Sequence, residues 1–413
     1  MTTGYVLVPA TEAQDQIATE REWVEWGQPL LTLDQFVTRE KVILGTSDFS
    51  TTRRQRWVLV PADDTTTTDF LSACETYRRP ILIKRPKEKV ERGLSYSICS
   101  VFVPQNKRRL GYAGLMMKLL QQNLSPHGEV PSGLQEQENV EVKGSEAIVK
   151  GLDEEEGELG DGEKYGRNAT CSFLYSDIGE YYSQFGWNVV GNRHVEWSPL
   201  SESSISLPEN AEWLTVEGLS SLAKLDRDHL LTELEASSST SIKFCIDDPD
   251  ATSWRWLIKR TNFYATTLLP ASSAKPTHFG LRIPGKNGKA DSYAVWMFDY
   301  IERKIAILRL RFTSKEAFQQ LVGAVRRQAA KFGMNKCLAW NVNLSSLGVE
   351  LTHEDEDKVK QGVKVERFAT ELQGGSVVER HGSGASLPAL AWYGDKKKGE
   401  KVEWVCNEYG WWC

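Results

Sequence analysis

The sequence has few of the residues that build disulfide frameworks, metal centres or membrane spans. Its seven cysteines are scattered without a C-x-x-C pair, and its six histidines form no cluster. This usage favours a reducing compartment and argues against structural zinc or a histidine-rich metalloenzyme. No stretch approaches the ~18 consecutive apolar residues of a membrane-spanning helix, and the N-terminus lacks the basic patch and apolar core of a secretory signal. We therefore expect a cytoplasmic protein without a metal or membrane contact.

The charged residues are distributed unevenly along the 413-residue chain. Residues 126–168 contain twelve acidic and four basic side chains, so the rest of the chain is close to neutral. This segment is rich in Gly, Gln and Pro and almost free of aromatic residues, which predicts a disordered insertion. Between Arg78 and Arg109, ten basic residues face only two acidic ones. Such a local basic stretch suits a small polyanionic ligand better than a long nucleic acid.

Hydrophobic periodicity predicts an α/β (α+β) protein whose halves share one order of elements. In the first half, Thr11 and Thr32 are placed to cap helices that run to Trp26 and Leu44. The further elements expected there are strands at 5–9, 56–61, 71–85 (bent or interrupted at Pro80), 94–103, 170–175 and from Trp187, with helices at 111–124 and about 178–184.

A Ser-rich linker at 201–206 predicts a boundary between a first domain at 1–200 and a second at 201–413. The second half shows a helical stretch, a strand pair, a helix and a strand, at 216–236, 294–301 with 304–312, 314–332 and 336–342. Because strand, strand, helix, strand is also the order around 94–175, we expect the second domain to be a degenerate repeat of the first.

Residues 101–113 read V-F-V-P-Q-N-K-R-R-L-G-Y-A, a strand that leaves through a basic turn and enters a helix. The first N–H groups of a helix lack partners within the helix and have partial positive charge. Gly111 and Ala113 lack bulk, so a phosphate can approach this backbone closely, and Lys107, Arg108 and Arg109 add charge. The pattern predicts a pyrophosphate site made largely of main chain. The alternative is that Gly111 serves only helix–sheet packing. The spacing fits neither the nucleoside-triphosphate loop nor the dinucleotide motif.

Two elements give the sequence its family resemblance. The residues from Arg108 to Ala113 match R-x-x-G-x-A, and Y-S-Q-F-G-W from Tyr182 to Trp187 follows the next expected strand. With these elements, residues 5–197 resemble the GNAT acetyltransferase superfamily. C-E-T-Y-R-R from Cys74, S-V-F-V from Ser100 and L-Y-S-D-I-G from Leu174 are similar to the fungal lysine Nε-acetyltransferase family. The resemblance implies a GNAT-type sheet, acetyl-CoA as co-substrate, and acetylation of free L-lysine in amino-acid catabolism.

The resemblance also assigns the coenzyme site. In a GNAT fold, the strand before the turn pairs with the pantetheine arm, and the helix start holds the pyrophosphate. The matching residues in this chain are Val101, Phe102, Val103, Arg108, Arg109, Leu110, Gly111, Tyr112 and Ala113.

Two residues are predicted to be catalytic. Tyr182 matches the position where the superfamily often places the acid for the leaving thiolate, and a phenol with pKa near ~10 is protonated at neutral pH. Neighbouring Tyr181 complicates this assignment, and the alternative for Tyr182 is simple packing. The strand at 94–103 contains no carboxylate, so Glu75 on the preceding strand is the candidate base or holder of the amine. Equally, Glu75 could be a surface or salt-bridged glutamate facing Arg78 or Arg79.

The acceptor site is predicted from the early helices and the C-terminal residues. Trp23, Trp26 and Asp34 are candidate contacts for free lysine, although such tryptophans more often belong to a core. The final residues E-Y-G-W-W-C are too aromatic for a free tail, so we expect them to dock, with the carboxylate of Cys413 near the acceptor.

Two other function classes remain open on the sequence. One is a protein acetyltransferase acting on peptidyl lysine or N-termini, and the other is a non-catalytic acyl-CoA-binding or interaction protein. The second half reads R-F-T-S-K-E at the matching turn, where an acid in the first helical turn would repel phosphate. We expect this half to close an acceptor pocket, which favours a small amine substrate.

Overall fold

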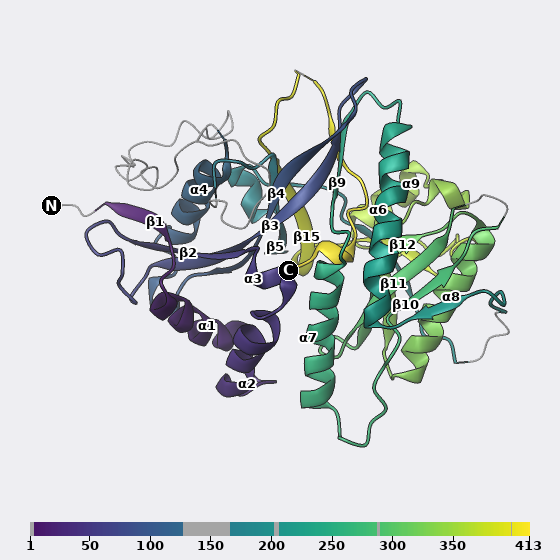
Figure 1. The fold of residues 1–413 in the computed structure, drawn as a ribbon, viewed down its shortest axis with the longest axis horizontal. Coiled ribbons are helices and arrows are strands. Elements are labelled where there is room, and N and C mark those ends of the chain that lie inside the picture. Colours follow the sequence, from purple (N-terminus) through teal and green to yellow (C-terminus); the bar gives the residue numbers. More distant parts are fainter. Residues whose placement is uncertain (1–3, 127–165, 202–205, 287–289, 398) are drawn as a thin grey trace.

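The computed structural model describes residues 4–126, 166–201, 206–286, 290–397 and 399–413. Two mixed β-sheets lie side by side, each flanked by helices (Figure 1). The α/β (α+β) class predicted from the sequence is confirmed. Most of the predicted acidic insertion at 126–168 and of the Ser-rich linker at 201–206 lies outside the described residues.

The first sheet has the strand order β1-β2-β3-β4-β5-β15-β6, and β9 joins it by pairing with β3. Its strands are β1 (Tyr5–Pro9), β2 (Arg54–Pro61), β3 (Ser72–Lys84), β4 (Val90–Phe102), β5 (Cys171–Ile178), β6 (Asn188–Val189), β9 (Ile242–Ile246), β15 (Ser383–Trp392) and β16 (Val402–Trp404), which pairs with β9. The helical segments beside it are α1 (Glu12–Trp26), α2 (Leu33–Val37), the π-helical η1 (Thr38–Leu44), α3 (Asp48–Thr51), α4 (Tyr112–Leu124) and the 3₁₀ turns η2 (Gln105–Lys107) and η3 (Tyr181–Phe185).

Helices α1 and α4 cover opposite faces of the first sheet (Figure 1). Thr11 and Thr32 cap α1 and α2 as predicted, each with a capping box. Alternate residues of β2 point to the two faces: Trp57 packs in the cluster that contains α4, whereas Val58 packs with Ala18 of α1. The first sheet is therefore covered on both faces, so the groups that it can offer to a ligand lie at the ends of its strands.

The second sheet has the strand order β14-β7-β13-β12-β11-β10-β8. Its strands are β7 (Arg193–Trp197), β8 (Glu212–Leu214), β10 (Gly280–Ile283), β11 (Ser292–Asp299), β12 (Lys304–Arg311), β13 (Lys336–Trp340) and β14 (Ser376–Glu379). Its helical segments are η4 (Val216–Gly218), α6 (Leu219–Glu235), α7 (Thr252–Leu268), α8 (Lys315–Lys331), η5 (Ser345–Leu347), α9 (His353–Lys360) and η6 (Tyr409–Trp411).

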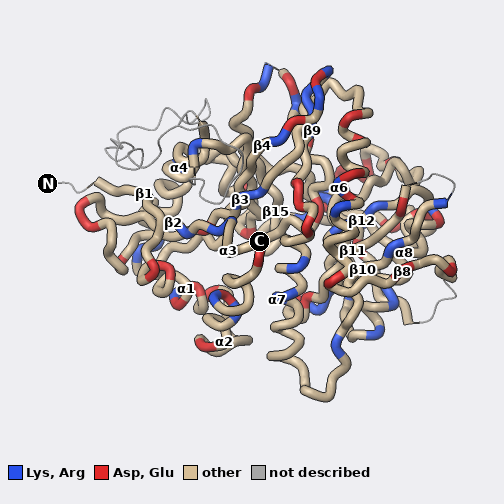
Figure 2. The backbone as a smooth tube through the Cα atoms, in the orientation of Figure 1, with Lys and Arg blue, Asp and Glu red and all other residues tan. Residues whose placement is uncertain are grey.

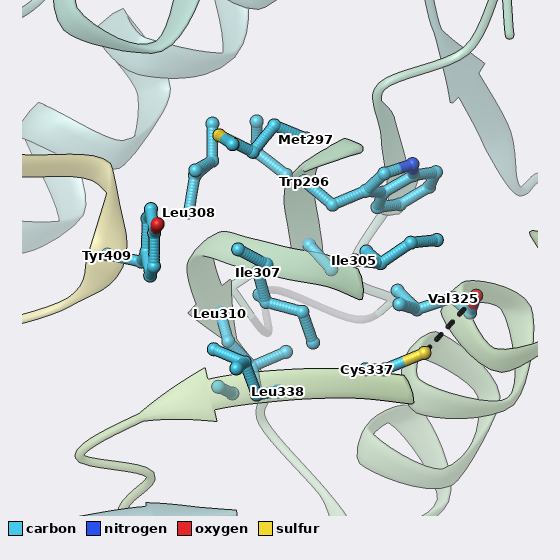
Figure 3. Close-up of a cluster of buried hydrophobic side chains, with 14 of the residues drawn as sticks. Trp296, Met297, Ile305, Ile307, Leu308, Leu310, Val325, Cys337, Leu338 and Tyr409 are labelled. Atoms are coloured by element: carbon cyan, nitrogen blue, oxygen red, sulfur yellow. Dashed lines mark hydrogen bonds between the residues drawn. The ribbon is translucent and has the colours of Figure 1, made fainter. Parts of the chain in front are cut away.

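The core of the second sheet is shown in Figure 3. Side chains of β11, β12 and β13 interdigitate there with Val325 of α8, whose carbonyl accepts a hydrogen bond from Cys337 Sγ at 3.9 Å. Tyr409, near the end of the chain, packs against the same cluster. The expected docking of the aromatic C-terminal residues is thus seen, with Tyr409 and Trp411 buried.

The strand expected at 71–85 is confirmed and is not interrupted at Pro80, whereas the helix expected at about 178–184 was wrong. Strand β3 is continuous through Pro80, because Pro80 lies between the segment that pairs with β2 and the segment that pairs with β9, where a missing N–H breaks no ladder bond. The helix expected at about 178–184 is instead the end of β5 followed by η3. Gly179, at φ +66°, turns the chain between them.

The two halves of the chain exchange strands. Strand β15, from the second half, pairs antiparallel with β5 in the first sheet, and β9 pairs with the outer part of β3. Conversely, β7 lies before residue 200 but pairs with β13 and β14 in the second sheet. A division at residue 200 stays a prediction, and the strand pairing shows that the two sheets do not strictly follow it.

Charged residues of both signs are interspersed over the described parts of both halves (Figure 2). Helices long and apolar enough to span a bilayer are absent from the described residues. All seven cysteines are free thiols.

Candidate active site

The site begins where two parallel strands separate. β4 and β5 pair from Ser95 with Cys171 up to Ile98 with Leu174, and both strands then continue without pairing to each other. A β-bulge disrupts the β3–β4 register just past this point, where Ser100 has φ +50°. The bulge and the divergence leave a gap in the first sheet beside the turn that leads into α4.

A groove of about 610 Å³ lies at this gap, and we call it the α4 groove. It is lined by Glu25, Trp26, Val101, Phe102, Val103, Lys107, Arg108, Arg109, Gly111, Tyr112, Ala113, Ile178, Tyr181 and Tyr182. Eight of the nine residues predicted for coenzyme binding therefore line one groove. The ninth, Leu110, lies outside this lining with 63% of its surface exposed.

The backbone at the start of α4 has an unusual conformation. Gly111 is the N-cap at φ +85°, Arg109 two residues earlier has φ +66°, and the helix start has no side-chain cap. A Cβ on Gly111 would meet no atom within 4 Å, so glycine is needed here for its conformation and not for want of room. The uncapped N–H groups remain available to an anion in the groove.

The three basic residues of the turn differ in their partners. Lys107 pairs with Asp69 at 2.7 Å, and Arg108 pairs with Glu25. Within the described part of the chain, Arg109 makes neither a hydrogen bond nor an ion pair, and its side chain lines the α4 groove. The residues present fit a diphosphate group held by main chain with one adjacent cation.

A second cavity of about 340 Å³, the central cavity, adjoins the α4 groove. Its lining combines residues of both halves: Glu22, Trp26, Phe36, Arg39, Glu40, Glu75, Tyr77, Ile98, Cys99, Ser100, Val101, Leu174, Tyr175, Asp177, Ile178, Tyr182, Trp256, Arg260, Trp412 and Cys413. The groove and the cavity share Trp26, Val101, Ile178 and Tyr182. A reacting group in the groove can thus meet a second molecule in the cavity at these residues.

Tyr182 lies at the junction, whereas Tyr181 lines only the α4 groove. The Tyr182 side chain is buried, and its hydroxyl has no hydrogen-bond partner among the described residues. Burial raises the pKa of Tyr182, with Tyr181 contributing, so the phenol is protonated at neutral pH and can donate. This position separates Tyr182, the tyrosine that the motif selects, from its neighbour Tyr181.

Glu75 is buried in a cluster of arginines rather than facing Arg78 or Arg79. Its carboxylate accepts bonds from Arg54 at 2.6 Å and from Arg56, and Tyr77 donates its hydroxyl at 3.1 Å. Burial alone would raise the pKa of Glu75, but the Arg54 and Arg56 guanidiniums outweigh it and lower the pKa to about 2. A carboxylate so strongly stabilised is a weak base at neutral pH. Its role as a base stays a prediction.

Glu22 is a candidate that sequence reasoning missed. It lies on the buried face of α1, four residues after Ala18, and lines the central cavity. Both of its carboxylate oxygens bind Arg56. Burial raises the pKa of Glu22 to about 7, although Arg56 opposes the shift. The available signal was an acidic residue at helical spacing from a core alanine.

Cys413 lines the central cavity with Trp412. A hydrogen bond with Cys99 lowers the pKa of the Cys413 thiol to about 7, with burial opposing and Arg79 assisting. Cys413 therefore lies in the central cavity, and a contact between its carboxylate and the acceptor stays a prediction. The thiol is a second group in the cavity that can exchange a proton near neutral pH.

The remaining acceptor predictions differ in outcome. Trp26 lines both the groove and the cavity and makes an edge contact with Phe102 at 6.3 Å. Trp23 instead packs in the core beside α2, where its Nε1 donates to the carbonyl of Leu31 at 2.7 Å. Asp34 is exposed in the first turn of α2 and lines neither the groove nor the cavity. Groups of three or more metal-ligating side chains are not found among the described residues.

Comparison with known proteins identifies the family. Residues 194–413, from β7 to the last described residue, match the family model described as the LYC1 GNAT-like C-terminal domain. The chain belongs to this family. A lysine acetyltransferase of Yarrowia lipolytica (strain CLIB 122 / E 150) is 22% identical over 431 residues, covering 97% of this chain and 98% of the relative. The protein is thus a GNAT-type N-acetyltransferase related to the fungal lysine acetyltransferase, and acetyl-CoA is its co-substrate.

Solved structures with a similar chain path include a probable N-acyltransferase and a tandem GNAT protein. A probable N-acyltransferase of Enterococcus faecalis V583 is 11% identical with a TM-score of 0.49, covering 95% of this chain and 73% of that one. A tandem GNAT protein from the clavulanic acid biosynthesis pathway is 8% identical with a TM-score of 0.40, covering 95% of this chain and 100% of that one.

Proposed function

We propose that this acetyltransferase transfers the acetyl group of acetyl-CoA to the side-chain amine of free L-lysine, by direct attack within a ternary complex. The observation that supports this most strongly is the junction at Tyr182. There the α4 groove, which fits the coenzyme, meets a cavity of about 340 Å³ lined from both halves of the chain. A cavity of this volume suits an amino acid. The relative named as a lysine acetyltransferase supports lysine as the acceptor.

Acetyl-CoA bound in the α4 groove supplies an activated thioester. The helix start at Gly111 and the side chain of Arg109 hold the diphosphate, and the unpaired end of β4 at Val101–Val103 offers main-chain groups to the extended arm. A main-chain N–H near the bulge at Ser100 stabilises the oxyanion that develops during attack.

Two proton transfers complete the reaction. The amine enters as an ammonium and must lose a proton before it can attack. Glu22 lines the cavity with a pKa of about 7, which suits a general base at neutral pH better than the pKa of about 2 at Glu75. Glu75 then acts as a permanent anion that attracts the ammonium. Tyr182 donates its phenolic proton to the departing thiolate.

The test is release of coenzyme A thiol from acetyl-CoA, measured against free amino acids, polyamines and histone peptides. L-Lysine should give the highest kcat/KM, and mass spectrometry of the product should place the acetyl group on the ε-nitrogen. A faster reaction with peptides would support a protein acetyltransferase instead. Binding of acetyl-CoA without turnover on any amine would overturn the proposed reaction.

A further inference from the structure

Arg260 is a cation in the wall of the central cavity, and the carboxylates of Glu40 and Asp299 lie near enough to act on its charge without forming an ion pair with it. It lies on α7, and its guanidinium carbon is 5.1 Å from the ring centroid of Trp412 and 5.7 Å from that of Tyr264. Within the described ranges, its guanidinium makes neither a hydrogen bond nor an ion pair. The other arginine of the cavity, Arg39, is by contrast paired with Glu40. The donors of Arg260 are therefore available to a ligand.

Arg260 lies where the central cavity meets a further cavity. A smaller cavity of about 190 Å³, the distal cavity, shares Asp177, Arg260 and Trp412 with the central cavity. Tyr182 and Val101 belong to the central cavity and the α4 groove but not to the distal cavity. Arg260 thus lines the part of the central cavity that adjoins the distal cavity, and it is not part of the α4 groove lining.

Asp177 supplies the opposite charge at the same junction. One of its carboxylate oxygens accepts from the N–H of Ser386 at 2.9 Å and from the Ser386 hydroxyl at 3.0 Å. The second oxygen has no hydrogen-bond partner among the described residues. A planar guanidinium and a half-satisfied carboxylate together complement a carboxylate and an ammonium held on one carbon.

We propose that Arg260 and Asp177 bind the α-carboxylate and α-ammonium of the acceptor, so that the enzyme selects a free α-amino acid whose reacting amine lies at the end of its side chain. The inference rests on the proposed function and names its specificity determinant. With the head group at Arg260, the lysine side chain must reach Tyr182 through the central cavity, whose lining also includes Trp256 and Tyr175. Lysine within a peptide has neither head-group charge, which disfavours it here.

Two analogues of lysine separate the two contacts. Pentane-1,5-diamine keeps both terminal amines but lacks the carboxylate, and 6-aminohexanoate keeps the carboxylate but lacks the α-amine. For the native enzyme we expect kcat/KM to be at least about 100-fold higher for L-lysine than for the diamine, because a site built for a charged group rejects an analogue without it. A smaller preference, of about tenfold, is expected over 6-aminohexanoate, since Asp177 is exposed.

Variants then assign each preference to a residue. Arg260→Gln should reduce the preference for L-lysine over the diamine by about 30-fold or more, through KM for lysine, while Arg260→Lys should retain part of it. Asp177→Asn should reduce only the preference over 6-aminohexanoate. Arg255→Gln is the matched control, because Arg255 lies on the same helix but pairs with Asp48 at the surface. It should change neither ratio.

The outcomes are distinguishable from failure of the proposed function. If the native enzyme acetylates no free amine, the proposed function fails. If it acetylates L-lysine and the diamine equally, or if Arg260→Gln lowers kcat/KM equally for both, the reaction stands and the role of Arg260 is overturned. The comparison of substrates on the native enzyme decides the matter even if a variant folds poorly.

Discussion

The two sheets of this protein repeat one arrangement of strands and helices. They differ in whether the space beside the two parallel strands, where their pairing ends, is open. In the first, the β3–β4 hairpin leads into α4, then into β5 parallel to β4, then into η3 and Gly186 at φ +95°. In the second, the β11–β12 hairpin leads into α8, then into β13 parallel to β12, then into η5 and Gly348 at φ +72°. Each hairpin contains a β-bulge. The expected degenerate repeat is therefore visible in the backbone.

The difference lies in what occupies the space beside the bulged strand of each sheet. Beyond Ile98, β4 faces the α4 groove. Beyond Ile307, β12 is covered by the chain around Glu408 and Gly410, which we call the C-terminal segment. There the Glu408 carboxylate accepts from the N–H of Leu310 at 3.0 Å and from Arg309 at 2.8 Å. The same backbone thus leaves an open groove in one sheet and a filled core in the other, because residues of the second sheet and of the C-terminal segment satisfy each other's polar groups.

Tyr182→Phe should have the largest effect on this comparison. Four residues before the glycine, the first sheet has Tyr182 and the second has Leu344, so this change gives the first sheet an apolar side chain as well. We expect kcat to fall about 10²- to 10³-fold, since the leaving thiolate loses its acid, with little change in KM for acetyl-CoA. Steady-state kinetics of thiol release measure this. Tyr181→Phe, in the groove alone, should affect KM more than kcat, and an unchanged kcat in Tyr182→Phe would remove the acid role.

Gly111→Val should close the ligand site by its backbone. A β-branched residue at φ +85° is strained, and its Cβ points into open space in the groove. We expect the Kd for coenzyme A, measured by calorimetry, to rise about 100-fold. Gly382→Val is the matched control, because Gly382 has φ +71° and equally open surroundings but lies outside the groove. Equal losses in both variants would show that strain alone, and not the site, is being measured.

The sequence predicted the parts of the site that consecutive residues build. The turn from Val101 to Ala113 and the Y-x-x-x-G-[FW] element are local, so their motifs placed both the groove and Tyr182. Glu22 and Arg260 reach the central cavity from helices far apart in the chain, and no spacing within the sequence relates them. The pairing of β15 with β5 is likewise non-local, since a strand pattern does not specify its partner.

Glu22→Gln tests whether Glu22 is the general base. The comparison is with Glu408, a buried carboxylate of similar pKa that binds the backbone and Arg309 beside the second sheet. Burial raises the pKa of both Glu22 and Glu408 to about 7, against arginines that oppose the shift. A raised pKa means that the carboxylate is lost as the pH falls through 7, so kcat/KM for lysine should fall about tenfold per pH unit below 7. Glu22→Gln should lower kcat/KM about 30-fold at pH 8 and flatten this limb. A limb that persists in Glu22→Gln but disappears in Cys413→Ser would assign the base to the thiol.

Glu408→Ala should act on the filled site of the second sheet. The change leaves the N–H of Leu310 without its partner, although Arg309 keeps its pair with Asp226 at 2.8 Å. We expect the free energy of unfolding, from urea denaturation, to fall by about 2 kcal/mol. Calorimetry should still show one bound coenzyme A per chain. A second binding event would mean that the C-terminal segment alone prevents the second sheet from binding coenzyme.

Ser314→Ala should have the smallest effect, because it changes only a helix cap. Ser314 accepts a hydrogen bond from the N–H of Ala317 at 3.1 Å and caps α8, whereas the corresponding position of α4 is Gly111 without a side-chain cap. Removing the hydroxyl should lower the free energy of unfolding by about 1 kcal/mol. It should not create a coenzyme site, because Glu316 still places negative charge in the first turn and the C-terminal segment still covers β12. Any change in the Kd for coenzyme A beyond about twofold would contradict the independence of the two sheets. An unchanged Kd together with the small loss of stability would show that the cap of α8 serves only the stability of its own sheet.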